Sequence, residues 1–267
     1  MKQIVRVLAA TVVLALGAAG CGGGSSPTDT LQPADAVRAA VSTTTHEQSS
    51  RLAMTIHTDA GAIKVDMMVD GLFDYAHKTG TMSMTIPGSN QKLKMVITPG
   101  TMYMTVPGHG TSYYSIPTKD LGGTSFGAAT DPTQSLQLLT GLSDDVKSVG
   151  TAMVRGDETT HYRGTYDLKR GLNRLTGLAK QQVQKLIDSQ ATTLVPFDAY
   201  IDSDGRLRKM VQVTDTKLPG ASGQSVHSTV TMELYDFGTP VNVKIPTDVK
   251  DGSAFLGAMK GQLGTGS

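Results

Sequence analysis

The only thiol in the chain, Cys21, stands directly after a run of small residues. Upstream of it, Lys2 and Arg6 give a positively charged start, and the apolar run 7–16 is followed by Gly17–Gly20. A charged start, a short apolar run and then small residues are typical of an export signal. The run is shorter than the ~20 apolar residues that span a bilayer. A single cysteine forms no internal disulfide, so its thiol is available to accept a diacylglyceryl group.

We therefore expect Cys21 to be the lipidated first residue of a bacterial lipoprotein. Such sites usually carry Leu three positions before the cysteine, where this chain has Ala18. The alternative is an ordinary cleaved signal with an incidental cysteine. The expected organisation is a signal peptide over 1–20, the lipidated cysteine with a Gly/Ser-rich tether over 21–32, and a single domain over 33–267. The expected location is the extracytoplasmic face of the cell membrane.

No catalytic pattern stands out in the rest of the sequence, which lacks H-E-x-x-H and the phosphate-loop pattern. The segment Asp202–Gly205 resembles the start of a calcium loop without its later Glu, which favours a hairpin turn. We expect that the protein is not an enzyme and binds no metal ion or cofactor. An esterase-like activity is the alternative. Six histidines lie apart, without metal-ligand spacing: His46, His57, His77, His109, His161 and His227.

Charge and composition narrow the class of protein further. The chain has 24 Lys and Arg against 23 Asp and Glu, with no basic stripe, so we expect no nucleic-acid partner. It contains 13 Met but only five Phe and no Trp. Methionine is flexible and polarizable and fills irregular volumes, so this composition favours an adaptable apolar interior.

Apolar residues recur with a period of two over most of the chain, which predicts strands. Pro and Gly bound many of these strands, as in an antiparallel meander. The expected strands lie near 49–57, 63–70, 73–75, 82–86, 93–97, 102–106, 146–155, 159–168, 195–201, 207–213, 226–234 and 241–245. Helices are expected over 33–45, from Pro132 to Leu142 after a cap at Asp131, over 171–189 and near 255–259. The expected fold class is α+β, with one large, strongly curved antiparallel sheet (a half-barrel) and helices packed on its concave face.

Alternation places most methionines on the aliphatic faces of their strands. If neighbouring strands pair in register, these side chains form one apolar surface. Two interpretations stay open: helices cover this surface as a solid core, or the sheet curves too widely and a dry cavity remains for an apolar ligand. The candidate lining residues are Met54, Ile56, Val65, Met67, Met82, Met84, Met95, Met102, Met104 and Met232.

Several segments are similar to the actinobacterial envelope lipoproteins of the LppX, LprA, LprF and LprG family. Besides the cysteine and its tether, they are Gly100–Gly108 (GTMYMTVPG), Thr159–Leu168 (TTHYRGTYDL) and Pro196–Lys209 (PFDAYIDSDGRLRK). The resemblance covers most of 35–248. It implies a fold like that of the periplasmic carrier LolA, with helices across the mouth of a half-barrel, and lipids or lipoglycans bound in an apolar cavity.

On this resemblance, the expected function is a membrane-anchored envelope lipoprotein that binds and transfers lipids or lipoglycans. The expected partners are an acylated lipid or lipoglycan and, through the lipid on Cys21, the membrane, while a membrane transporter partner stays open. The alternative is a non-enzymatic structural or interaction lipoprotein with a filled core. The family carries no transferable ligand motif, so the candidate lining residues rest on strand alternation alone.

Overall fold

The computed structural model describes residues 31–61, 63–85, 91–121, 132–175, 177–189, 192–217 and 225–253. Its first strands are β1 (Ser49–Ala60), β2 (Ile63–Asp74), β3 (Thr79–Thr85), β4 (Lys92–Thr98), β5 (Thr101–Thr105) and β6 (Tyr113–Pro117). The later strands are β7 (Lys147–Val154), β8 (Asp157–Asp167), β9 (Leu194–Asp202), β10 (Leu207–Lys217), β11 (Ser225–Tyr235) and β12 (Val249–Asp251). The helices are α1 (Pro33–His46), α3 (Pro132–Leu138), α4 (Leu168–Leu172) and α5 (Gly177–Ser189), with 3₁₀ turns over Thr118–Leu121 and Leu139–Gly141.

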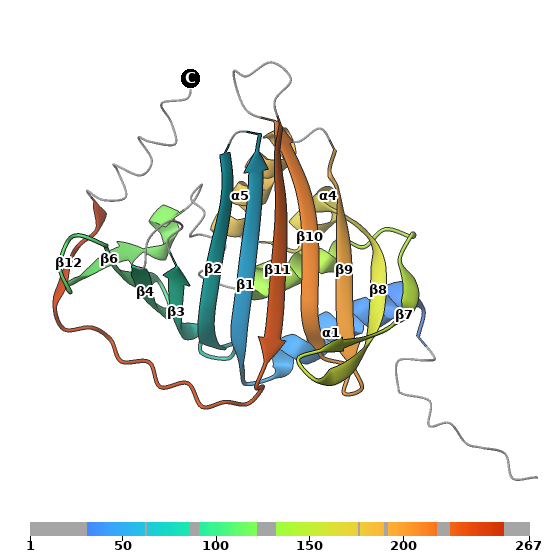
Figure 1. Cartoon of the computed structure of the whole chain (residues 1–267), viewed down its shortest axis with the longest axis horizontal. Helices are drawn as coiled ribbons and strands as arrows, with labels where there is room; N and C mark the ends of the chain where they lie inside the picture. Colours follow the sequence, from blue (N-terminus) through green and yellow to red (C-terminus); the bar gives the residue numbers. More distant parts are fainter. Residues whose placement is uncertain are drawn as a thin grey trace, which may run out of the picture.

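These strands form one sheet in the order β12-β6-β5-β4-β3-β2-β1-β11-β10-β9-β8-β7. Neighbours are antiparallel except β12 and β6, which are parallel. The sheet is curved, and the helices lie behind it in the view of Figure 1. Within the described residues β7 and β12 do not pair, so the sheet is open. The expected curved antiparallel sheet with helices on one face is confirmed.

Helix α1 shows why a helix docks on this sheet. Pro33 stands at its first turn, where a missing N–H costs nothing. Its buried residues recur at spacings of three and four: Ala36, Val37, Ala40, Val41 and Thr44. This helix contacts β7, β9 and β10. The hydroxyl of buried Thr44 accepts a hydrogen bond from the Leu207 N–H at 2.8 Å, which ties the helix to the start of β10.

The hydrophobic core lies between the helices and the sheet. Across β3, β4 and β5, Met95 stands opposite Met82 on one side and Met104 on the other, and all three are buried. The rings of Phe73 and Tyr75 meet edge to face with centroids 5.6 Å apart. Thioether and aliphatic side chains from adjacent strands therefore fill this part of the interior themselves.

The predicted strand over 241–245 is wrong. This segment forms no strand and runs from the end of β11 to β12 as an extended strap (Figure 1). Val241, Val243 and Ile245 do alternate, but no neighbouring strand pairs with them, and Ile245 is 58% exposed. Pro240 and Pro246 bracket the segment, and proline lacks the N–H that a ladder needs.

The predicted helix over 171–189 is also wrong in its extent. It begins earlier, at Leu168, where the Asp167 carboxylate accepts the Lys169 N–H at 2.9 Å. It then breaks after Leu172 in a turn in which the Leu175 N–H donates to the Leu172 carbonyl, and a second helix follows at Gly177. A buried Leu175 within the turn kept the apolar period intact and concealed the break.

Three smaller differences concern element boundaries. Residues 73–75 end β2 and lead into a turn, and they do not open a new strand. The short strands β6 and β12 were not expected, because five and three residues are too few to show an alternation. The expected cap at Asp131 and the helix near 255–259 lie outside the described residues.

We predict that Thr44→Val destabilises the fold by about 1–3 kcal/mol, because the isosteric side chain leaves the buried Leu207 N–H without its acceptor. Urea unfolding of the two proteins measures the difference. Thr43→Val is the matched control, since its side chain makes no hydrogen bond within the described chain and should change stability by less than about 0.5 kcal/mol. Equal effects of the two substitutions would contradict this role for Thr44.

We predict that Tyr75 makes the fold less stable at high pH. Burial raises its pKa to about 12, against the opposing effect of its hydrogen bond with Ser50, whereas the unfolded phenol ionises near 10.0. The contribution is present below pH 10 and is lost as the pH rises towards about 12, with a slope of at most about 1.4 kcal/mol per pH unit. Urea unfolding from about pH 9 to pH 11 should show a smaller slope for Tyr75→Phe. Unchanged slopes would contradict the prediction.

Candidate functional site

The inner face of the four central strands β2, β1, β11 and β10 is the candidate site. Pairing in register places Met54 of β1 between Val69 of β2 and Met232 of β11. Two residues further along β1, Ile56 lies between Met67 and Val230 by the same register. Because side chains alternate across a strand, these residues point to one face, the face on which the helices pack.

Burial changes along this inner face. At one end of β1, Leu52 is 1% exposed and belongs to the core. Beyond it, Met54 and Ile56 are only half-buried, and the neighbouring strands show the same change from Met232 to Val230. The inner face is therefore closed over at the end near α1 and only partly covered towards Ala60.

The candidate lining residues divide between these two regions. Buried in the core are Met82, Met84, Met95, Met102, Met104 and Met232. Half-buried are Met54, Ile56, Val65 and Met67. The register brings the two sets together at Val69, which faces Met54 on β1 and Met84 on β3. Cys21 lies outside the described residues.

A row of hydroxyl side chains crosses the half-buried region. Thr58 lies opposite Ser228, which lies opposite Thr214 on β10. Gln212, one step deeper, lies opposite Val230. A bulge between Leu207 and Lys209 shifts the alternation of β10, so that Met210, Gln212 and Thr214 face inward while Val211 and Val213 face outward. Sequence reasoning missed this row because the apolar pattern of β10 points to the wrong face without the bulge.

The charged residues of these four strands lie on the outer face. Arg51, Asp59, Lys64, Asp66 and Glu233 all occupy register positions that alternate with the inward residues. Arg208, at the bulge, is the exception and is held in a polar network described below. The half-buried inner face is thus apolar at depth, hydroxyl-bearing nearer the end of the strands, and free of charge at its inward register positions.

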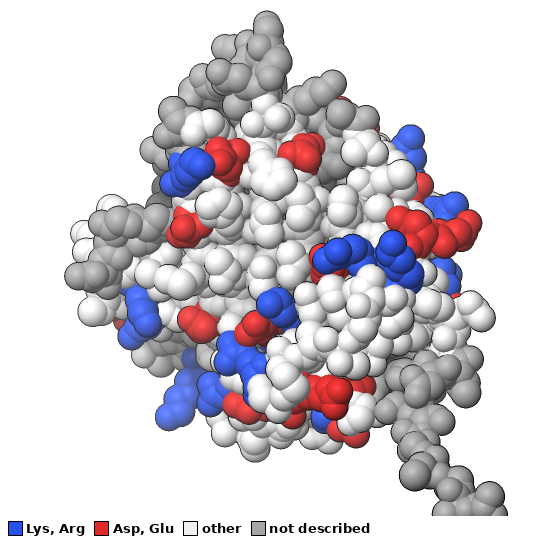
Figure 2. Space-filling view, turned by 45° about the vertical axis from the view of Figure 1, so that its right-hand side comes forward, with Lys and Arg blue, Asp and Glu red and all other residues white. Residues whose placement is uncertain are grey.

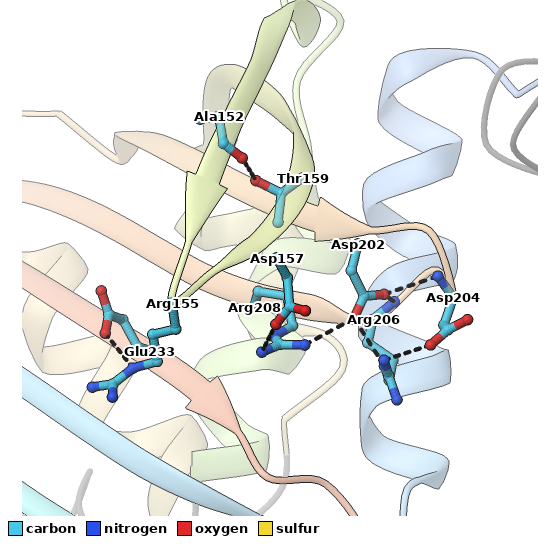
Figure 3. A network of polar contacts seen from close by, with 9 residues as sticks. All are labelled: Ala152, Arg155, Asp157, Thr159, Asp202, Asp204, Arg206, Arg208 and Glu233. Atoms are coloured by element: carbon cyan, nitrogen blue, oxygen red, sulfur yellow. Dashed lines mark hydrogen bonds and ion pairs between the residues drawn. The ribbon is translucent and has the colours of Figure 1, made fainter.

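A second polar group gathers at the β9–β10 hairpin (Figure 3). One Asp202 oxygen accepts the N–H groups of Asp204 and Arg206 at 3.1 and 2.9 Å, and Gly205 takes a positive φ of 76°. The other oxygen pairs with Arg206 at 2.9 Å and with Arg208 at 3.3 Å, and Arg208 also pairs with Asp157. The hairpin turn predicted for Asp202–Gly205 is confirmed.

The charged groups of this polar network pair with one another and so stabilise the hairpin. Burial lowers the pKa of the Arg206 guanidinium, but its hydrogen bond to Asp202 and the charges of Asp202 and Asp204 outweigh that effect and raise the pKa. A hollow of about 420 Å³ lies beside the hairpin, yet arginines engage three of its carboxylates, Asp157, Asp202 and Asp204. Across the part of the chain that the structure describes, no three His, Cys, Asp or Glu side chains could hold a metal ion.

The outer face carries His161, one of the six histidines. Its ring stacks on Tyr200 with centroids 4.3 Å apart, and its Nε2 lies 2.5 Å from Asp198. Burial raises the pKa of Tyr200, with a further rise from the charge of Asp198. On the face shown in Figure 2, basic and acidic side chains are intermixed, with no patch of one sign.

The match to a family model decides the relationship of this chain to known proteins. The model of the LppX_LprAFG lipoprotein family matches residues 32–243. The chain belongs to this lipoprotein family. A search of curated proteins returns no significant match.

Two solved structures of mycobacterial proteins share the fold. LprF from Mycobacterium bovis has 16% identity and a TM-score of 0.53, with 80% of this chain and 96% of that chain covered. LppX from Mycobacterium tuberculosis has 15% identity and a TM-score of 0.53, with 79% and 98% covered. At these identities the likeness concerns the fold. Among the described helices, none has the length and apolar character needed to cross a bilayer.

We predict that Asp202→Ala destabilises the protein by about 3–5 kcal/mol, because it leaves Arg208 buried without one carboxylate partner. Asp202 and Arg208 side chains are 4% and 9% exposed. The control is Asp204→Ala, whose side chain is 65% exposed and should contribute less than about 1 kcal/mol. Guanidinium unfolding compares the two, and a small effect of Asp202→Ala would refute a structural role for the network.

Proposed function

We propose that this protein is a lipid carrier of the cell envelope, anchored through a lipid on Cys21 at the extracytoplasmic face of the membrane. It binds the acyl chains of a lipid or lipoglycan in an apolar cavity at the half-buried end of the inner face. Membership of the lipoprotein family supports the anchor and the location. The observation that carries the proposal is the row of half-buried apolar residues Met54, Ile56 and Met67 between a filled core and a row of hydroxyls.

The energetics of such a site are favourable. Each methylene taken out of water contributes about 0.8 kcal/mol, so a 16-carbon chain contributes on the order of 10 kcal/mol before ordering costs. Thioether side chains such as Met54 and Met67 adapt to a flexible chain because three torsions are free to rotate. Lipid binding therefore requires apolar area and pliable walls here, without a dedicated catalytic group.

The gradient of polarity along the strands suggests how a lipid lies. Its acyl chain would contact Met54 and Ile56, and its polar portion would meet the hydroxyls of Thr58 and Ser228 nearer the strand ends. Because no charged residue occupies the inward positions of these strands, the portion bound inside carries no charge of its own. Transfer between membranes requires that this binding is reversible and that the expected tether lets the domain move away from its own membrane.

A filled-core scaffold remains the second candidate, and one observation favours it. Met82, Met84, Met95, Met102 and Met104 are buried by the protein's own residues, so this part of the inner face is closed. The carrier proposal accordingly rests on the half-buried end of β1, β2 and β11 alone. The two candidates differ in whether lipid accompanies the purified protein.

We predict that solvent extraction of the protein, purified without residues 1–21 and without detergent, releases acyl lipid detected by mass spectrometry. Ile56→Asp should lower the recovered lipid at least about fivefold, because an ionised carboxylate in an apolar site is costly to desolvate. The loss of stability should stay below about 2 kcal/mol, because this position is half-buried and water reaches the new carboxylate.

The matched control is Thr55→Asp, one residue away on the same strand and exposed on the outer face. It adds the same charge to β1 and should leave lipid recovery unchanged. Absence of lipid from the unsubstituted protein, or equal losses in the two variants, would favour the filled-core scaffold.

A further inference from the structure

The outer face of the sheet carries a groove that has no part in the proposed lipid site. It holds about 430 Å³ and runs from Tyr235 and Arg51 over the small residues Thr81 and Ser83 to Lys94. A second hollow of about 340 Å³ continues it along Lys92 and the 106–111 loop, and the two share Lys94 and Tyr113. Each volume lies in the range of small-molecule sites, about 300–1,000 Å³.

The groove forms because the strand register places short side chains next to each other in one row across the sheet. On the outer face Asp70, Ser83 and Lys94 lie opposite one another across β2, β3 and β4. Thr105 comes next, with its hydroxyl accepting the Lys94 N–H at 2.9 Å, and Thr105 in turn lies opposite Tyr113. Short hydroxyl side chains therefore form the floor, while tyrosine, lysine and arginine side chains form the walls.

The middle of this row offers unused polar groups. Within the described residues, neither Lys94 nor Lys92 has an ion-pair partner, whereas Arg51 is paired with Asp236 at 3.3 Å. The Thr105 hydroxyl uses its oxygen as an acceptor and keeps its proton to donate. The Tyr113 ring has no aromatic or cationic partner among the described residues, unlike the Tyr235 ring, which lies 3.9 Å from the Arg155 guanidinium.

The chemistry of the row selects the ligand. An added peptide strand needs a free sheet edge, but β2, β3, β4 and β5 are each paired on both sides. A ligand therefore meets side chains alone: hydroxyls, the Lys94 ammonium group, tyrosine rings, and the aliphatic side chains of Leu72 and Val96. Hydroxyls bond to the hydroxyls of a sugar, an aromatic ring stacks on its C–H face, and unpaired lysines attract an anion. Asp70 stands at the far end of the row and directs an anionic group towards Lys94.

We infer that this groove binds an acidic saccharide, whose carboxylate or phosphate pairs with the Lys94 ammonium while the adjoining sugar ring stacks on Tyr113. Ser83 and Thr105 bond to its hydroxyls from either side of Lys94. The site faces away from the inner surface, so its occupancy does not depend on whether a lipid is bound there.

The test is calorimetric titration of protein made from the full-length sequence and kept in detergent, with tetragalacturonate as the acidic probe. Maltotetraose is the neutral probe, and inorganic phosphate tests the anion alone. We expect tetragalacturonate to bind, maltotetraose to bind at least about tenfold more weakly, and phosphate to bind more weakly still, with an affinity for tetragalacturonate that falls as salt rises.

Substitutions locate the binding. Lys94→Gln should weaken tetragalacturonate binding about tenfold or more, and Tyr113→Leu about threefold to tenfold. Lys147→Gln is the charge-matched control on exposed β7, at the opposite end of the strand order, and should leave affinity unchanged. No binding of tetragalacturonate, equal binding of maltotetraose, equal binding of phosphate, or equal losses from Lys94→Gln and Lys147→Gln would each overturn the assignment.

Discussion

An antiparallel register that runs from β6 to β11 through β1 is the constraint on which this molecule depends. Because side chains alternate strictly along each strand, one register decides at once which residues enter the interior and which meet water. A slip of one residue on β1 would bring Met54 and Ile56 to the surface and carry Arg51 and Asp59 into the core. The apolar row that joins Met232, Met54, Val69, Met84 and Leu93 exists only because each strand keeps the alignment of its neighbour.

Burial is uneven along the inner face, and the proposed function rests on that difference. Near α1 the helices close over the sheet and Thr44 accepts the Leu207 N–H. In the other half of the sheet, the methionines of β3 to β5 are buried against each other. Further along β1 the same kind of residue is half-buried. A filled interior stabilises the sheet at one end, and a half-buried apolar surface is left at the other, where we propose that the lipid binds. The filled-core interpretation thus applies to one end of this face, and the proposed cavity concerns the other end.

The sequence alone predicted the alternation of side chains, the antiparallel meander and the first helix, because each depends on residues that are close together in the chain. It missed the break after Leu172, since a buried Leu175 inside the turn maintains the helical period. It also assigned a strand to Val241–Ile245, where the alternation is genuine but no partner strand lies alongside. Sequence reasoning also did not predict the bulge before Lys209, and it therefore missed that Gln212 and Thr214 face inward.

Local chemistry was thus readable from the order of residues: the charged, apolar and small segments before Cys21, the Asp202–Gly205 turn, and the aliphatic side of each strand. These properties depend on side chains within one turn or one strand of each other. Long-range pairing settled the rest, namely which strands are neighbours, which half of the inner face the helices cover, and that Lys94 stands in line with Ser83, Thr105 and Tyr113. Such pairings join residues that are far apart in the chain, so no pattern within a few residues predicts which strands become neighbours.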